Sequence, residues 1–436
     1  MRRAVGQVTI DILPDDVLLD IFDIYGGDDD HIPIRRWKSL VHVCRGWRHI
    51  VLASPGRLRL VLECSARTSV SKLLDTWPPL PITIRYSPVD AIEGEDNIIT
   101  TLELRDRITG ITFDKLREWE TLERFTTTSF PALTRLDLVS NHRRYHPTLI
   151  FPEAFLGGSA PQLRSLTLSN IVFPKLPKIL LSATRLVRLS LLQLRLPVAR
   201  HHASPEMMVT YLAALPTLEE ISVGFRWQDP EFRPDPINPP HRTRVILPAL
   251  THFHFNGASE YLEDFVSRID TPLLDDLNIV FFQHHILHIQ QLYGLISRSE
   301  SFKRLKKAYI CFYSFDTYTM IAPRSSIRFL LGIRGHGSTW EIESMAQICE
   351  DFSPLFSRVK WLGILGNLLF PSALSGDDTE CAHWLKLFHP FPAVQSLFVS
   401  NRFAQRVSPV LRGPTQSEER STDVLPALRD LVLEGL

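Results

Sequence analysis

The sequence has few of the features that mark secreted or membrane-spanning proteins. Its 436 residues include five cysteines, which are scattered and never as close as C-x-x-C, so neither a disulfide framework nor a zinc clip is predicted. No apolar run approaches the ~18 residues that a membrane helix needs. The first residues also lack the apolar stretch of a secretory signal. We therefore expect an intracellular protein, cytoplasmic or nuclear.

An excess of charge of one sign is absent as well. Lys and Arg together number 48, and Asp and Glu together number 48. General nucleic-acid and anionic-membrane binders rely on neutralising phosphates, so we expect neither nucleic acid nor membrane as a partner. Hydrophobic residues make up 44% and charged residues 22%, values near the globular average, which excludes a wholly disordered chain.

Motifs of catalysis are missing too. The sequence contains no G-x-S-x-G, no Walker loop and no H-E-x-x-H. His142 and His146, like His284 and His288, are spaced i, i+4, but neither pair has a third ligand at a fitting distance, so surface or groove histidines are favoured over a metal site. We predict no enzyme, no catalytic residue, no cofactor and no metal. An enzyme whose scattered Asp, Glu and His meet in space stays open as an alternative.

The first sixty residues have the pattern of short amphipathic helices. Apolar residues recur at helical spacing from Ile12 to Tyr25, with Pro14 expected at the first helical position. A second run begins at Pro33, and Gly46 is expected to break it before a third. So small a domain has a marginal core and more apolar residues than it can bury, which predicts an adaptor module. The alternative is a terminal cap whose apolar stripe packs on the domain that follows.

The residues in this segment also resemble a known family. Leu13-Pro14, Ile21-Phe22 and Val43-Cys44-Arg45-x-Trp47-Arg48 resemble the F-box, in the version found in the large F-box family of basidiomycete fungi. The resemblance implies helices that bind the Skp-family adaptor of a Skp–cullin–F-box ubiquitin ligase. Carried over by motif position, it assigns as adaptor-contacting or supporting residues Leu13, Pro14, Val17, Leu18, Ile21, Phe22, Leu40, Val43, Cys44 and Trp47.

The rest of the chain repeats one phrase. Its form is apolar-x-x-apolar-x-apolar, usually after Pro, and one copy is FPALTRLDL from Phe130. The other copies start at Ala160, Ala183, Leu215, Leu247, Thr271, Phe302, Phe356, Phe391 and Leu425. The gap between Phe302 and Phe356 is expected to conceal a degenerate copy at Ile327–Ile333. Alternating apolar positions predict a short strand in each copy, and the stretches between copies resemble return helices.

These observations predict an α/β fold, a short helical F-box followed by an irregular leucine-rich-repeat-like solenoid with parallel strands and helical returns. The expected domains are an F-box-like domain at 8–60, a connecting segment at 61–95 and the solenoid at 96–436. The resemblance to the fungal family extends through the link into the repeats and covers nearly the whole chain. The interruptions at 226–241 and 407–423 are interpreted as loops on the solenoid rim.

Two functions fit this organisation. The first is the substrate-recognition subunit of a Skp–cullin–F-box ubiquitin ligase, which binds the Skp-family adaptor, and through it a cullin, at one end and an unknown target protein at the other. The second is a non-catalytic interaction scaffold with no role in a ligase. Aromatic and histidine clusters such as His252–Phe255 are interpreted first as core packing and, alternatively, as a recognition face on the strand side.

Overall fold

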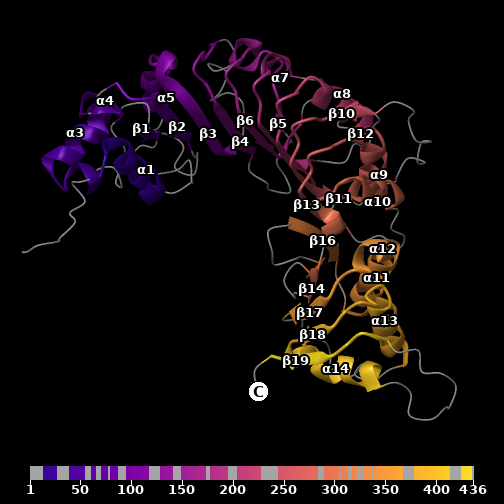
Figure 1. Ribbon diagram of the computed structural model, residues 1–436. Coiled ribbons are helices and arrows are strands. Elements are labelled where there is room, and N and C mark those ends of the chain that lie inside the picture. The colour runs from indigo at the N-terminus through magenta and orange to yellow at the C-terminus, as the bar shows by residue number, and fades with distance from the viewer. Residues whose placement is uncertain are drawn as a thin grey trace, which may run out of the picture. The chain divides into compact units, whose positions relative to one another are not determined.

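The computed structural model shows that every repeated phrase contains a strand. All ten strands begin at the sixth residue of their copy. Figure 1 shows strands and helices alternating along the chain. The first residue of each copy is buried, and so are most of the residues three positions later. These strands are β4 (Arg135–Ser140), β6 (Ser165–Ser169), β8 (Arg188–Leu194), β9 (Glu220–Phe225), β11 (His252–Gly257), β13 (Asp276–Phe282), β14 (Lys307–Phe312), β17 (Trp361–Gly366), β18 (Ser396–Val399) and β19 (Asp430–Leu433).

The structure describes most but not all of the chain. The chain divides into two compact units. Unit 1 comprises residues 1–171 and 177–183, and unit 2 comprises residues 172–176 and 184–436. The described residues are 13–26, 39–54, 60–64, 70–76, 79–86, 95–116, 128–140, 149–172, 177–194, 204–226, 244–282, 289–304, 306–312, 317–321, 328–335, 338–366, 378–412 and 424–434.

Unit 1 contains the N-terminal helices and a parallel sheet. Its strands follow the order β1-β2-β3-β4-β6, and each neighbouring pair is parallel. The segment expected to connect the two modules contains β1 and β2, whose Leu60, Leu62, Ile82 and Ile84 are fully buried, so the sheet of this unit begins at Leu60. The remaining elements of unit 1 are α1 (Asp15–Gly26), α3 (Arg45–Ala53), β1 (Leu60–Glu63), α4 (Val70–Thr76), β2 (Ile82–Tyr86), α5 (Glu95–Leu102), β3 (Ile108–Leu116), β5 (Leu149–Ile150) and α7 (Lys178–Ser182), with β7 (Ile171–Val172) at the unit boundary.

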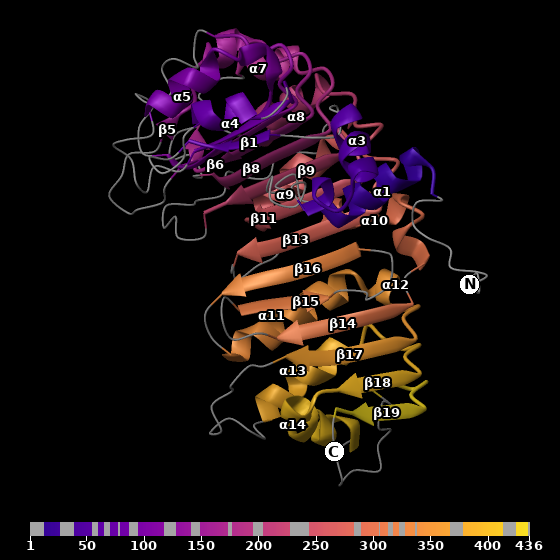
Figure 2. The same cartoon turned by 90° about the vertical axis from the view of Figure 1, so that its left-hand side faces the viewer.

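Unit 2 contains a ladder of strands with helices on one face. In Figure 2 the strands β13 to β19 face the viewer, with α11, α13 and α14 behind them. The return helices expected between copies are present here, for example as α8 and α9. The remaining elements are α8 (Pro205–Ala213), β10 (Val245–Ile246), α9 (Ser259–Ser267), β12 (Ile269–Asp270), α10 (Gln290–Arg298), β15 (Thr317–Ile321), β16 (Arg328–Gly335), α11 (Ser338–Asp351), α12 (Ser353–Phe356), α13 (Asp378–Phe388) and α14 (Asn401–Arg412).

The concealed copy at Ile327–Ile333 is confirmed as strand β16, but its place in the sheet breaks the sequential order. The order in this region is β13-β16-β15-β14-β17. β16 is parallel to β13, β14 is parallel to β17, and β15 runs antiparallel between β16 and β14. Two strands, β16 and β15, therefore separate β14 from β13, and β14, β15 and β16 form an antiparallel meander.

Strand alternation separates core from surface in the repeats. Phe253 and Phe255 of β11 are buried, whereas His252, His254 and Asn256 on the opposite face are half-buried. The interpretation of this cluster as core packing is thus correct for the phenylalanines. The predicted α/β fold with parallel strands and helical returns, a leucine-rich-repeat-like architecture, is confirmed within each unit.

Three local expectations were wrong. Helix α1 begins at Asp15, with Pro14 just outside it, because the Pro14 carbonyl accepts the first helical hydrogen bond from the amide of Leu18 at 3.0 Å. The break expected at Gly46 lies at residues 42–44 instead, and Gly46 falls in the first turn of α3. The interruption expected at 407–423 is helical up to Arg412, because Phe403, Val407 and Val410 lie at helical spacing and are buried.

Candidate protein-interaction surface at the N-terminus

Helix α1 carries apolar side chains on two different faces. Leu18, Leu19 and Phe22 are buried, and Phe22 has no exposed surface at all. Four other apolar residues at i, i+4, i+7 and i+8 form a second, exposed face. They are Val17, Ile21, Ile24 and Tyr25. Ile24 is 80% exposed. Large apolar side chains that gather on one exposed side of a helix have the character of a contact surface.

The buried face of α1 packs on the start of α3. The rings of Phe22 and Trp47 lie with their centroids 4.6 Å apart at an angle of 54°. Cys44 caps α3 from an extended conformation, and its Sγ accepts a hydrogen bond from the amide of Trp47 at 3.4 Å. Arg48 donates from Nε to the carbonyl oxygen of Val41 at 2.9 Å. The ring contact holds α1 against α3. The hydrogen bonds of Cys44 and Arg48 fix the chain at the start of α3.

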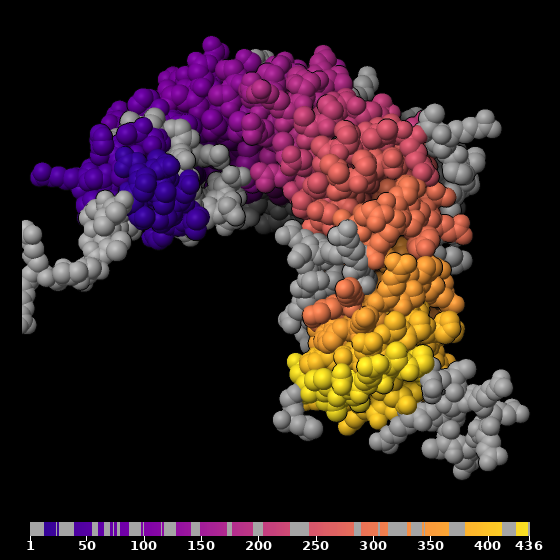
Figure 3. All heavy atoms as spheres, viewed as in Figure 1, coloured from indigo at the N-terminus to yellow at the C-terminus, as the bar shows by residue number. Residues whose placement is uncertain are grey.

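The ten residues assigned by resemblance divide into three groups. Leu18, Phe22 and Leu40 are buried and can only support the surface. Leu13 and Trp47 are half-buried. Five are exposed and can contact a partner directly, namely Pro14, Val17, Ile21, Val43 and Cys44. In the space-filling view, atoms of the N-terminal helices (indigo) lie at the surface (Figure 3).

The motif assignment omitted three exposed apolar residues of these helices. Ile24 and Tyr25 extend the face that begins with Val17 and Ile21, and Leu52 is exposed on α3. The spacing of Ile24 and Tyr25 from Val17 is the signal that identifies them, because residues seven and eight positions apart share a helix face. We define Val17, Ile21, Ile24 and Tyr25 as the α1 outer face.

The described residues offer little for catalysis. They contain no group of three or more His, Cys, Asp or Glu side chains that could hold a metal ion. Both histidine pairs noted in the sequence, His142/His146 and His284/His288, lie outside the described residues. Burial, partly offset by a hydrogen bond with Thr101, raises the pKa of the Cys64 thiol to about 11. Such a thiol is a protonated core group rather than a nucleophile at neutral pH.

One hydroxyl–imidazole–carboxylate series does occur in unit 2. Thr251 Oγ1 lies 2.7 Å from His252 Nδ1, and His252 Nε2 lies 3.9 Å from an Asp276 carboxylate oxygen. The second distance exceeds that of a hydrogen bond, and Thr251 Oγ1 also donates to the carbonyl of Glu219 at 3.1 Å. These side chains therefore link neighbouring strands by polar contacts, and the Thr251 hydroxyl is not activated as a nucleophile.

Comparisons with known proteins do not assign this chain to a family. No protein-family model matches the sequence, and no curated protein matches it. A solved leucine-rich-repeat protein of Leptospira interrogans is similar over 88% of this chain and 79% of its own, at 14% identity and a TM-score of 0.28. A TM-score that low carries no argument about either fold or function. No helix among the described residues is both long and apolar enough to cross a membrane.

Proposed function

We propose that this chain is the substrate-recognition subunit of a Skp–cullin–F-box ubiquitin ligase. In this proposal the N-terminal helices bind a Skp-family adaptor, which connects the chain to a cullin. The repeats hold a target protein for ubiquitin transfer, so the chain contributes proximity and no chemistry of its own.

One observation carries the proposal: α1 is apolar on a face that its own fold leaves exposed. Each large apolar side chain that a partner buries contributes about 1.5–3 kcal/mol. The segment also contains the Leu-Pro and V-C-R-x-W-R elements that resemble the F-box, and the contacts of Cys44, Trp47 and Phe22 give those elements a structural role. A scaffold outside ubiquitination is the second candidate, since the exposed face supports binding without identifying the partner.

The test is co-purification of the full chain with a basidiomycete Skp-family adaptor. The variant Val17→Asp with Ile21→Asp places two carboxylates on the α1 outer face without touching Leu18 or Phe22. We expect adaptor affinity to fall at least about a hundredfold, because the complex loses two apolar side chains that the adaptor would bury. The matched control is Leu181→Asp with Ile246→Asp, which changes two apolar residues of the repeats that are more exposed, at 56% and 63%, than Val17 and Ile21, at 39% and 36%.

The outcomes separate the two candidates. Adaptor binding by the wild type and the control, lost in the α1 variant, supports the ligase role. A folded wild type that does not bind the adaptor leaves only the scaffold. Affinity within twofold in the α1 variant means that the α1 outer face is not the binding surface.

A further inference from the structure

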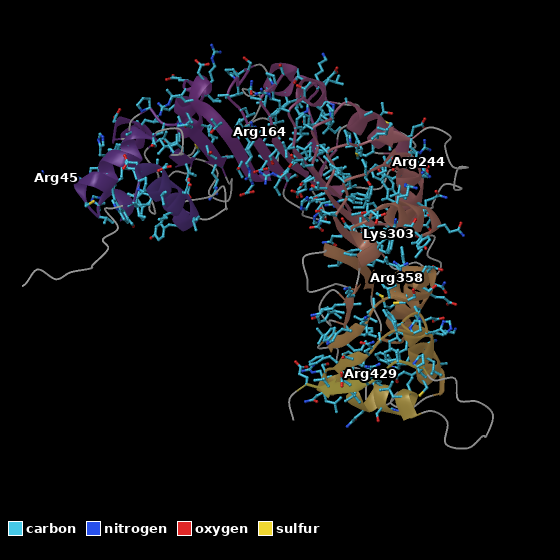
Figure 4. All side chains as sticks on the ribbon, viewed as in Figure 1. Arg45, Arg164, Arg244, Lys303, Arg358 and Arg429 are labelled. Carbon is cyan, nitrogen blue, oxygen red and sulfur yellow. The ribbon has the colours of Figure 1, made fainter. Side chains whose placement is uncertain are left out.

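A row of basic side chains precedes three of the last strands of unit 2. The carbonyl of Lys306 accepts from the amide of Lys360 at 2.9 Å, the carbonyl of Lys360 from the amide of Gln395 at 2.8 Å, and the carbonyl of Gln395 from the amide of Arg429 at 2.8 Å. These residues stand immediately before β14, β17, β18 and β19, so their backbones lie side by side at the strand spacing of about 4.8 Å. Figure 4 labels Arg429 of this row.

These basic groups have no anionic partner among the described residues. No carboxylate there lies within ion-pair distance of Lys306, Lys360, Arg429 or the adjoining Lys307, and all four are exposed. The nearest acid in the pairing register is Asp430, which accepts a hydrogen bond from the Ser396 hydroxyl at 3.1 Å. Like charges on neighbouring strands repel, so an anionic partner would stabilise this edge.

Three aromatic rings stand beside the basic row, on the strand face opposite the helices. Tyr309, Trp361 and Phe398 come from β14, β17 and β18, and all three are half-buried. The ring centroids of Tyr309 and Trp361 are 4.7 Å apart, and those of Trp361 and Phe398 are 6.2 Å apart at 23°. The residues that alternate with them, such as Ile310 and Leu362, are fully buried in the core.

Gly363 allows the indole ring to lie against the sheet. It stands in register between Tyr309 and Phe398. A Cβ at this position would lie 2.7 Å from Cη2 of Trp361 and 2.9 Å from Cδ1 of Tyr309. Only a residue without a side chain leaves room for the ring here, and the three rings together form a platform that we call the aromatic platform.

We propose that the aromatic platform and the basic row together bind an acidic segment of a partner protein that carries an apolar or aromatic side chain. Carboxylates of the segment pair with Lys306, Lys307 and Lys360, while its apolar side chain packs on Trp361. The proposal rests on the proposed function in one respect, since it places target binding in the repeats. Trp and Tyr are among the residue types that dominate binding energy at protein interfaces, and the basic row adds charge complementarity to an acidic segment.

The charges of unit 2 favour a peptide over a nucleic acid. At the same position before the strand, β9 and β13 have the exposed carboxylates of Glu219 and Asp275. Asp430 lies on the same strand face as the aromatic platform. A uniform polyanion would meet repulsion from these groups, whereas a short acidic segment over β14 and β17 would not.

The test is fluorescence anisotropy of labelled probes with the purified full chain at low ionic strength. The first probe is a short synthetic peptide in which Glu and Asp flank a single Leu-Phe pair. The second replaces Leu-Phe with Ser-Gly, the third replaces the acids with Lys, and the fourth is single-stranded oligothymidylate. We expect the first probe to bind best and its Kd to rise as salt is added.

Three variants locate the binding. Lys306→Glu with Lys360→Glu, and separately Trp361→Ala, should each raise the Kd of the first probe at least about tenfold. The control is Arg164→Glu, because Arg164 is the exposed cation at the same repeat position before β6 of unit 1, where Figure 4 labels it. Its Kd should stay within twofold. Thermal unfolding of each variant establishes that it is folded.

Several results would overturn the inference: no binding of the first probe by the wild type, equal binding by the Lys306/Lys360 variant, or tighter binding of oligothymidylate. The same preparations are tested for adaptor co-purification. If the peptide fails while the adaptor binds, the peptide site is wrong and the proposed docking role stands. If the adaptor fails while the peptide binds, the reverse holds.

Discussion

Helices α1 and α9 are similar in length and apolar content but differ in what surrounds them. In α9 the apolar residues are all buried, and they are Tyr261, Leu262, Phe265 and Val266. The helix contacts α8 on one side and α10 on the other. In α1, four of the seven apolar residues form the exposed outer face. A stacked repeat supplies each helix with neighbours, whereas the exposed outer face of α1 has the character of a contact surface.

This difference predicts that stability and binding are located in different parts of the molecule. Substitutions inside the repeats should lower the free energy of unfolding and leave adaptor binding unchanged. Substitutions on the α1 outer face should do the opposite. Single substitutions can test whether stability and adaptor binding are separate in this way.

Replacing Trp384 should have the largest effect. Its indole is fully buried among Phe312, Phe388 and Phe403, with ring centroids about 6 Å away. Trp384→Ala leaves a cavity and should lower the free energy of unfolding by about 3–5 kcal/mol, measured by chemical denaturation. The control is the neighbouring Leu385→Ala, which removes a 44% exposed side chain and should cost less than about 0.5 kcal/mol. Similar losses in the two variants would contradict the assigned core.

Glu263 should have an intermediate effect. This buried carboxylate of α9 accepts hydrogen bonds from the amides of Gln291 and Leu292 at 2.7 and 2.9 Å, and so caps the first turn of α10. Glu263→Ala leaves two buried donors without a partner and should lower the free energy of unfolding by about 1–3 kcal/mol. Glu263→Gln retains one acceptor oxygen and should lose less.

The control for Glu263 is Glu260→Ala in the first turn of the same helix. Glu260 is half-buried and accepts from the hydroxyl of Ser259, so its loss should cost less than about 1 kcal/mol. If Glu260→Ala destabilised as much as Glu263→Ala, general helix electrostatics rather than the cap would explain both. Adaptor binding should be unchanged in all three variants.

Much of the repeat architecture could be predicted from sequence because the phrase has a fixed internal frame. The strand begins at the sixth residue in all ten copies, since the buried first and fourth residues set where the chain enters the sheet. The order β16-β15-β14 could not be predicted in this way. Each copy specifies a strand but not which strand it pairs with, and an antiparallel strand between copies leaves no trace in the phrase.

The candidate surfaces were predictable to different degrees. Periodicity identified α1 as a helix, but it could not tell which apolar face was buried, because both faces carry large apolar residues. The aromatic platform could have been predicted from the sequence. Trp361 is the sixth residue of its copy, and Tyr309 and Phe398 are the eighth residues of theirs, and these positions alternate with the buried ones. Comparing those outward positions between copies would have located it. The role of Gly363 depends on the close approach of the Trp361 and Tyr309 rings to its backbone, which the sequence pattern does not show.

Cysteine labelling should distinguish the exposed N-terminal helices from the buried core by the accessibility of their thiols. Cys44 is exposed, whereas Cys64 and Cys349 are buried and burial raises the pKa of both thiols. At neutral pH iodoacetamide should modify Cys44 within minutes and leave Cys64 and Cys349 intact, as measured by peptide mass spectrometry. Adaptor binding should protect Cys44, which lies among the exposed residues of the proposed docking surface. Unchanged labelling of Cys44 in a purified adaptor complex would exclude this part of the surface from the contact.

The labelling of Cys64 should also depend on pH, whereas the accessibility of Cys44 should not. The pKa of Cys64 is about 11 in the folded chain and about 9 for an ordinary thiol, so the unfolded chain ionises first as the pH rises. Its contribution to stability is fully present below pH 9 and is lost as the pH increases towards 11. Labelling of Cys64 should therefore increase over that range because the sheet of unit 1 unfolds more often. Cys44 should be accessible throughout, because no unfolding is needed to expose it.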